Sequence, residues 1–242
     1  NRALEAFRNG QFVIVTDDAF RENEGDLIIA ATNLYSEQMA FMIRHTSGVV
    51  CVAMENDRAR ILDLPPMVTR NEDVKRTAFT VSVDAKAHLT TGISAAERAN
   101  TVRALADPNS SEFDFVRPGH VFPLRAVDGG LRVRRGHTEA AVALCELTGQ
   151  IKVAAISEIV DEDGAITRGA RLSNFALTWD IPLISIDELA QLVAQSSINN
   201  FDAEPSATAQ LPRSGAKWTI SIMRGRNGDE NVLLTLGQIG AT

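Results

Sequence analysis

Charged residues crowd into one short connector between two apolar runs. The connector holds Arg21, Glu22, Glu24 and Asp26, so that three carboxylates and one guanidinium fall within six residues. Carboxylates this close repel one another unless a cation or a hydroxyl-rich ligand joins them. A guanidinium next to them offers a fork for a phosphate or carboxylate. A solvated turn has the same composition, so these residues alone leave both interpretations open.

A second group of polar residues precedes an Ala-rich segment that is typical of a helix. It consists of Arg134, Arg135, Gly136, His137 and Thr138. The N–H groups and the dipole of a helix start favour an anion, and two arginines with a hydroxyl suit a phosphate. The histidine could ligate a metal or move a proton. The alternative is an ordinary helix start with flanking surface arginines.

Two further side chains are candidates for proton transfer. Arg117-Pro118-Gly119 predicts a tight turn that would aim His120 in one direction, although a lone histidine in a turn is often a surface residue. Glu158 lies in an apolar run, where a carboxylate is costly unless it is partnered. Burial would raise its pKa and suit a general acid or base. A solvent-facing position in the strand is the alternative.

Apolar runs and turn residues predict the elements that must position these groups. We expect strands at 12–15, 27–31, 49–54, 79–83, 153–160 and 183–186 and helices at 36–45, 56–64, 94–106, 139–147, 170–179 and 187–195. Ser94 and Glu97 form a capping box. Strands and helices mix without strict alternation, which predicts a compact α+β domain over residues 1–195. A linker at 196–216 and a short β hairpin within 217–242 complete the expected organisation.

Composition narrows the class of protein. The chain has 242 residues, 45% of them apolar, and 24 basic against 31 acidic residues give a net charge of −7. This mild acidity argues against a nucleic-acid partner, and no apolar run approaches the roughly 18 residues of a membrane span. Two cysteines, Cys51 and Cys145, without CxxC spacing predict free thiols and a reducing, cytoplasmic setting.

Six stretches, in order, closely resemble 3,4-dihydroxy-2-butanone 4-phosphate synthase of riboflavin biosynthesis and cover nearly all of residues 1–195. They are Asp17-Asp18 with RENEGD (21–26), IRHTSGVVC (43–51), TTGISAAER (90–98), RPGHVFPLRA (117–126), RGHTEA (135–140) and ISEIVDEDG (156–164). Six ordered matches are far more specific than any single motif. Ala19, Phe20 and the segment 71–76 depart from the family pattern.

The resemblance implies a lyase that converts D-ribulose 5-phosphate to L-3,4-dihydroxy-2-butanone 4-phosphate and formate through a metal-stabilised enediolate. It implies Mg²⁺ or Mn²⁺ held by Glu22 and His137, catalysis by His120 and Glu158, and a homodimer with active sites near its interface. The implied substrate contacts are Arg21, Glu22, Asp26, Arg134, Arg135, Gly136, His137, Thr138 and Glu158. We place the phosphate at Thr138 and Arg134.

The candidate residues by themselves are also compatible with two other functions. One is another metal-dependent sugar-phosphate enzyme of the epimerase or aldolase type, and the other is a catalytically silent scaffold. The tail resembles the opening of a GTP cyclohydrolase II domain through Leu211-Pro212 and two β runs. No cysteine follows Cys145 to bind the zinc of such a domain. We therefore expect a shortened or degenerate segment without cyclohydrolase activity.

Overall fold

The computed structural model describes residues 1–17, 23–199, 207–213, 216–224 and 230–236. The chain divides into two compact units, Asn1–Gln191 and Leu192–Thr242. The first unit contains the groups discussed above, and each unit has a sheet of its own.

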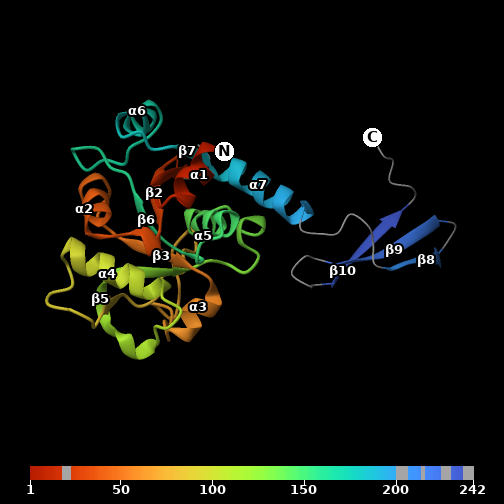
Figure 1. Ribbon diagram of the computed structural model, residues 1–242, viewed down its shortest axis with the longest axis horizontal. Coiled ribbons are helices and arrows are strands. Elements are labelled where there is room, and N and C mark those ends of the chain that lie inside the picture. The colour runs from red at the N-terminus through yellow and green to blue at the C-terminus, as the bar shows by residue number, and fades with distance from the viewer. Residues whose placement is uncertain (18–22, 200–206, 214–215, 225–229, 237–242) are drawn as a thin grey trace. The chain divides into compact units, whose positions relative to one another are not determined.

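The first unit is built on a mixed sheet whose seven strands follow the order β4-β5-β3-β6-β2-β1-β7 (Figure 1). The β1–β7 and β3–β5 pairs are parallel, and the other four pairs are antiparallel. This mixture confirms the expected α+β class. The strands are β1 (Val13–Thr16), β2 (Gly25–Ala30), β3 (Cys51–Met54), β4 (Val83–Ala85), β5 (Phe115–Arg125), β6 (Val153–Glu158) and β7 (Leu183–Ser185).

Helices cover both faces of this sheet. α5 packs on β2, β3 and β6 and against α1, whereas α4 packs on β4, β5 and β6 and against α2. The helices are α1 (Arg2–Arg8), α2 (Ser36–His45), α3 (Asn56–Ile61), α4 (Ala95–Ala106), α5 (His137–Thr148), α6 (Ala170–Thr178) and α7 (Ile186–Asn199). Short 3₁₀ turns are η1 (Ala31–Asn33), η2 (Glu112–Asp114) and η3 (Gly130–Arg132).

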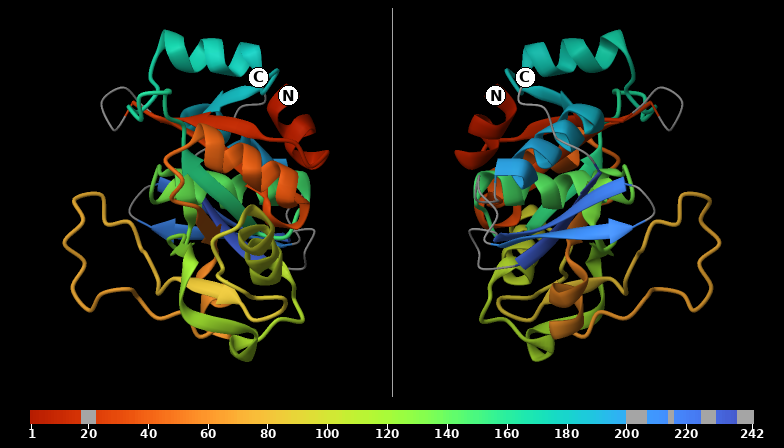
Figure 2. Two further views of the ribbon diagram at one scale, coloured as in Figure 1. Left: turned by 90° about the vertical axis from the view of Figure 1, so that its left-hand side faces the viewer. Right: turned by 90° about the vertical axis from the view of Figure 1, so that its right-hand side faces the viewer.

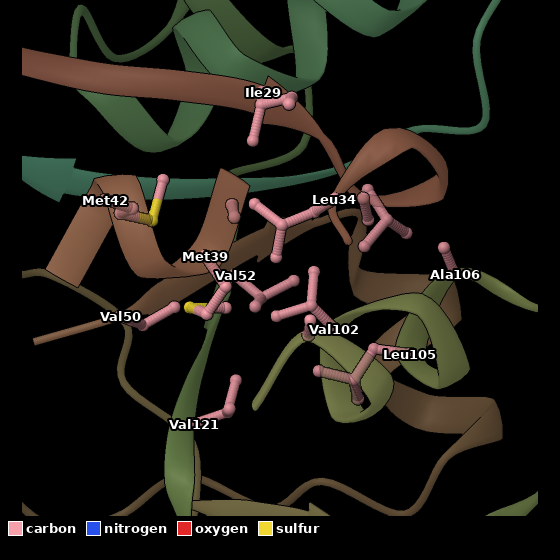
Figure 3. Packing of buried hydrophobic residues seen from close by; sticks show 14 of the residues in the cluster. Ile29, Leu34, Met39, Met42, Val50, Val52, Val102, Leu105, Ala106 and Val121 are labelled. Atoms are coloured by element: carbon pink, nitrogen blue, oxygen red, sulfur yellow. The ribbon is translucent and has the colours of Figure 1, made fainter. Parts of the chain in front are cut away.

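Alternating strand residues divide between the two faces. Val52 and Ile29 face α2 and α4, where they pack with Met39, Val102 and Leu105 (Figure 3). All six residues of β2 and all four of β3 are buried. Burial of both faces at about 25 cal/mol per Å² of apolar surface makes these strands the stable centre of the unit. The polar groups that β2 and β6 carry at one end are therefore held in place by rigid backbone.

The segment 117–120, expected as a tight turn, lies inside β5, with a cis peptide before Pro118. The β4–β5 register shifts between Val83 and Asp84, so this part of β5 bulges away from the ladder. Side-chain oxygens accept hydrogen bonds from the freed backbone N–H groups. The Gly119 N–H donates to Ser82 Oγ (3.1 Å), and the His120 N–H donates to Asp84 Oδ1 (2.9 Å). This substitution for ladder bonds allows one strand to continue where Pro and Gly predict a break.

The other expected boundaries need smaller corrections. The strand expected at 79–83 is found at Val83–Ala85, and Phe79 and Thr80 form only single bridges. The preceding segment, drawn in orange between α3 and β4, reaches out from the sheet (Figure 2). The helix from Ser36 to His45 matches its expected range. Ser94 caps α4 by accepting the Glu97 N–H, which confirms the expected N-cap, and the Glu97 carboxylate accepts from the Ser94 hydroxyl.

The second unit has three strands where a two-stranded hairpin was expected. β8 (Ala207–Arg213), β9 (Ala216–Arg224) and β10 (Glu230–Leu236) form an antiparallel sheet with β9 in the middle. β8 and the end of α7 both fall inside the range expected as a linker. Pro212 lies on the edge strand of this sheet, the position where proline is tolerated. None of the helices in the described ranges combines the length and apolar character of a bilayer-spanning segment.

Candidate active site

The start of β2, the end of β6 and the start of α5 meet at one place. β2 and β6 run antiparallel, and their register pairs Asp26 with Glu158. Directly paired residues direct their side chains to the same face of a sheet, about 5 Å apart. On this face lies α5, whose first residue is His137. Two carboxylates and an imidazole that are distant in the chain are thereby brought together.

These groups line a pocket of about 160 Å³. Its lining residues are Glu24, Asp26, Cys51, Thr77, Phe79, Leu124, Arg134, His137, Thr138, Ile156 and Glu158. Asp26 and His137 are buried, and Nδ1 of His137 lies 3.7 Å from Oδ1 of Asp26. A pocket of this size that joins three carboxylates, one imidazole and one guanidinium suits a small polar ligand. The aromatic groove between Phe12, Phe41 and Trp179 is larger, about 350 Å³, but holds no such convergence.

The start of α5 provides the basic side of the pocket. Gly136 is the N-cap, and no side chain caps this helix end. Thr138 in the first turn and Arg134 just before it both line the pocket. Backbone N–H groups, a hydroxyl and a guanidinium therefore face the same space, which is the arrangement that binds phosphate groups.

Glu158 is fixed at the other side of the pocket. Ser47 Oγ donates a hydrogen bond to Glu158 Oε2 at 2.8 Å, and the Ser47 N–H donates to the Glu158 carbonyl at 2.8 Å. Cys51 is a buried free thiol that also lines the pocket. Burial, together with the charges of Glu158 and Asp26, raises the pKa of the Cys51 thiol far above its usual range. Cys51 is therefore a neutral wall of this pocket.

His120 is on β5, beside β4, and is not among the residues that line this pocket. Its Nδ1 is 2.7 Å from Asp84 Oδ2, and its backbone N–H donates to the other oxygen of the same carboxylate. Asp84 is buried, whereas the His120 side chain is 42% exposed. A histidine held by a buried aspartate at Nδ1 presents Nε2 in one tautomer, as in general acid–base catalysis. Sequence reasoning missed Asp84, which is 36 residues away from its partner.

A polar turn packs against this pair. Gly92 approaches so closely that a Cβ there would lie 2.2 Å from Asp84 Oδ2 and 2.7 Å from His120 Nδ1, and its φ is +85°. Glu97 organises the turn by accepting hydrogen bonds from the Thr90 N–H (2.6 Å), the Thr90 hydroxyl (2.8 Å), the Gly92 N–H (3.1 Å) and the Ser94 hydroxyl (2.7 Å). The hydroxyls of Thr90 and Ser94 in this turn thus both bind Glu97.

Glu97→Gln is expected to lower the melting temperature at pH 7. Hydrogen bonds from the Ser94 hydroxyl, the backbone N–H groups of Thr90 and Gly92, and the Thr90 hydroxyl hold the pKa of Glu97 well below its usual range. A lowered pKa in the folded state adds stability above the unfolded pKa of about 4.3, and this stability is lost as the pH falls towards the folded value. Thermal unfolding at pH 7 and pH 3 tests this. An equal difference between variant and unaltered protein at both pH values would contradict it.

The remaining predicted site residues lie elsewhere. Arg135, expected among the substrate contacts, forms an ion pair with Asp187 and is not among the residues that line the pocket. Arg21 and Glu22 lie outside the described residues. Conversely, Glu24 lines the pocket and pairs with Arg168 at 2.7 Å, although only its place in the acidic connector signalled it.

The donor set suits a divalent cation. Within the described ranges, no three His, Cys, Asp or Glu side chains are already gathered at metal-binding distance. The pocket nevertheless joins the carboxylates of Asp26, Glu24 and Glu158 with the imidazole of His137. Mg²⁺ keeps several waters and needs only one or two carboxylates, and imidazole also suits Mn²⁺. The residues that line the pocket therefore fit such an ion.

A mixed sheet and a helix start that bring acidic, imidazole and basic groups into one pocket are typical of an enzyme that acts on a small polar molecule. The model of the 3,4-dihydroxy-2-butanone 4-phosphate synthase family matches residues 1–192. The chain is 51% identical over 198 residues to the Pyricularia oryzae enzyme of that name, with 77% of this chain and 85% of the relative covered. The chain therefore belongs to the 3,4-dihydroxy-2-butanone 4-phosphate synthase family.

Solved structures agree with this assignment. A crystal structure of 3,4-dihydroxy-2-butanone 4-phosphate synthase in complex with two magnesium ions has a TM-score of 0.78 at 48% identity, with 81% of this chain and 96% of that chain covered. RibBX from A. baumannii, a two-domain synthase, has a TM-score of 0.79 at 36% identity, with 98% of this chain and 69% of that chain covered.

One relative extends the match through the tail. Monofunctional riboflavin biosynthesis protein RIBA 2 of Arabidopsis thaliana is 44% identical over 242 residues. The match covers 99% of this chain and 50% of the relative, so this chain spans about half the length of that protein. Similarity to RIBA 2 and to RibBX thus includes the second unit.

Proposed function

We propose that the protein converts D-ribulose 5-phosphate to L-3,4-dihydroxy-2-butanone 4-phosphate and formate, in riboflavin biosynthesis. The main observation that supports this proposal is the pocket in which β2, β6 and α5 bring Asp26, Glu158 and His137 together. Arg134 and Thr138 line the same pocket. Relatives that share about half of the residues are named as synthases of this four-carbon product. The five-carbon substrate divides into a four-carbon and a one-carbon product without an added oxidant, so the side chains need only bind, orient and move protons.

In the proposed mechanism the phosphate binds at the start of α5. Thr138 and the first N–H groups of the helix contact it together with the guanidinium of Arg134. This places the sugar carbons toward the carboxylates at the other side of the pocket. Glu158, held by Ser47 at 2.8 Å, is the proposed base that removes a proton from the carbon next to the ketone. Asp26 is close enough to His137 to orient it.

A divalent cation completes this site. Glu22 and His137 are the proposed ligands, with Mg²⁺ or Mn²⁺ as the ion. When bound, the ion supplies Lewis-acid stabilisation of the negative oxygens of the enediolate. His120, oriented by Asp84, is the second proposed acid–base group.

We also propose a homodimer with its active sites near the interface, as the family resemblance implies. Cytoplasmic location stays a prediction, since RIBA 2 is described as chloroplastic.

Formate release tests the proposal directly. Purified protein with D-ribulose 5-phosphate and MgCl₂ is expected to release formate, to stop in EDTA, and to resume when Mg²⁺ or Mn²⁺ is returned. An epimerase would yield another pentulose and an aldolase a shorter sugar phosphate, both without formate. D-ribose 5-phosphate, the aldose isomer, is the substrate control. Folded protein that releases no formate with either metal would overturn the proposal and favour a silent scaffold.

Arg134→Ala is expected to raise KM for D-ribulose 5-phosphate about 10- to 100-fold with a smaller change in kcat. A hydrogen bond to a charged group contributes about 1.5–3 kcal/mol, and each 1.4 kcal/mol is tenfold in affinity. Arg135→Ala is the matched control, since Arg135 pairs with Asp187 outside the pocket. Steady-state kinetics measure both. An unchanged KM in Arg134→Ala would show that the phosphate does not bind at this end of the pocket.

A further inference from the structure

The guanidinium of Arg134 is hydrogen-bonded to a buried acid, Glu139, that does not itself line the pocket. Nη1 of Arg134 donates to Oε2 of Glu139 at 2.6 Å, and the Glu139 side chain is 1% exposed against 20% for Arg134. The other carboxylate oxygen of Glu139 accepts the Val127 N–H at 3.0 Å. Both oxygens of Glu139 are thus engaged, one by the backbone after β5 and one by the arginine that lines the pocket.

The chain is shaped to bring these two groups together. Gly136 lies between them, and a Cβ at this position would lie 2.1 Å from Nη1 of Arg134 and 2.8 Å from Oε2 of Glu139. Only glycine fits under this ion pair without displacing it. Gly136 therefore provides space for the Arg134–Glu139 contact.

Electrostatics explains why an acid is needed there. Arg134 precedes the N-terminus of α5, where the helix dipole is positive and repels a cation. Glu139 is in the first turn of this helix, where an acid is favoured, and it offsets the charge of the guanidinium. His137 and Thr138 in the same turn face the pocket, whereas Glu139 supports it from the buried side.

We propose that Glu139 is a positioning residue that holds Arg134 toward the phosphate of the substrate, an inference that rests on the proposed function. The same guanidinium also donates from Nη2 to the Lys75 carbonyl at 3.2 Å. Lys75 is two residues from Thr77, which lines the pocket. Glu139 therefore fixes, through Arg134, both the cationic end of the pocket and the segment beside it.

Glu139→Gln tests the proposal because it keeps the shape and the Val127 acceptor but removes the charge. We expect KM for D-ribulose 5-phosphate to rise about tenfold, kcat to change less than about threefold, and the affinity for inorganic phosphate, measured by calorimetry, to fall about tenfold. Glu139→Asp, which keeps the charge on a shorter side chain, should lie between. Glu146→Gln on the exposed end of α5, where Glu146 pairs with Lys152, is the matched control with unchanged kinetics.

A double-mutant cycle separates positioning from a general effect on folding. If Glu139 acts through Arg134, Glu139→Gln combined with Arg134→Ala has the KM of Arg134→Ala alone. Additive effects, or an unchanged KM and phosphate affinity in Glu139→Gln, would overturn the inference. Should Glu139→Gln not fold, Glu139→Asp carries the same comparison. Failure of the proposed function is distinguishable, because the unaltered protein would then bind phosphate but release no formate.

Discussion

Asp84→Asn is expected to lower kcat for formate release by about 10²- to 10⁴-fold, the usual contribution of a positioned acid–base group. The carboxylate accepts from the backbone and the ring of His120 at once. Asparagine keeps the oxygen for the His120 backbone N–H but places an NH₂ group opposite Nδ1. The ring must then carry its proton on Nε2, so the exposed nitrogen changes from an acceptor to a donor.

The matched comparison is His120→Asn, alone and with Asp84→Asn. If the aspartate acts through the histidine, the double variant is no slower than His120→Asn. Asp84 is buried and also attracts the positive charge of Arg98. The melting temperature of each variant therefore shows whether the protein still folds with Asn at this position. A kcat of Asp84→Asn close to that of the unaltered protein would show that the tautomer of His120 does not matter for the reaction.

His137→Ala is expected to abolish metal-dependent turnover, with a loss of about 10³-fold or more. Stabilisation of the transition state by a bound ion contributes several kcal/mol, and each 1.36 kcal/mol is tenfold in rate. His137 is buried in the first turn of α5 with Nδ1 directed at Asp26. The same loss is expected for Glu22→Ala, the other proposed ligand.

Binding of Mn²⁺, followed by its electron paramagnetic resonance signal, supplies a readout that does not depend on turnover. We expect weaker Mn²⁺ binding in His137→Ala and Glu22→Ala, and unchanged binding in His88→Ala, which removes an exposed histidine outside the pocket. Equal affinity for Mn²⁺ in His137→Ala and the unaltered protein would show that His137 is not a ligand of the ion.

Local signals predicted most of the elements. Capping by Ser94 and Glu97, the start at Ser36 and the apolar runs at 27–31 and 153–160 each depend on residues close in sequence, where periodicity and turn chemistry act. The same local signals gave a wrong prediction at 117–120, where Pro and Gly predict a turn and the structure has a strand. The failure has a long-range cause, because side chains of Ser82 and Asp84 replace the missing ladder bonds.

The sequence by itself determined the chemistry: an acidic connector, a basic helix start with a histidine, and six ordered motifs of one family. Tertiary structure alone decided which groups share a space. The β2–β6 register joins Asp26 to Glu158, whereas His120 and Arg135 are directed to Asp84 and Asp187. Glu139 reads locally as an ordinary first-turn acid, and only packing shows it beneath Arg134. Strand order and register depend on contacts between distant segments, which local periodicity does not encode.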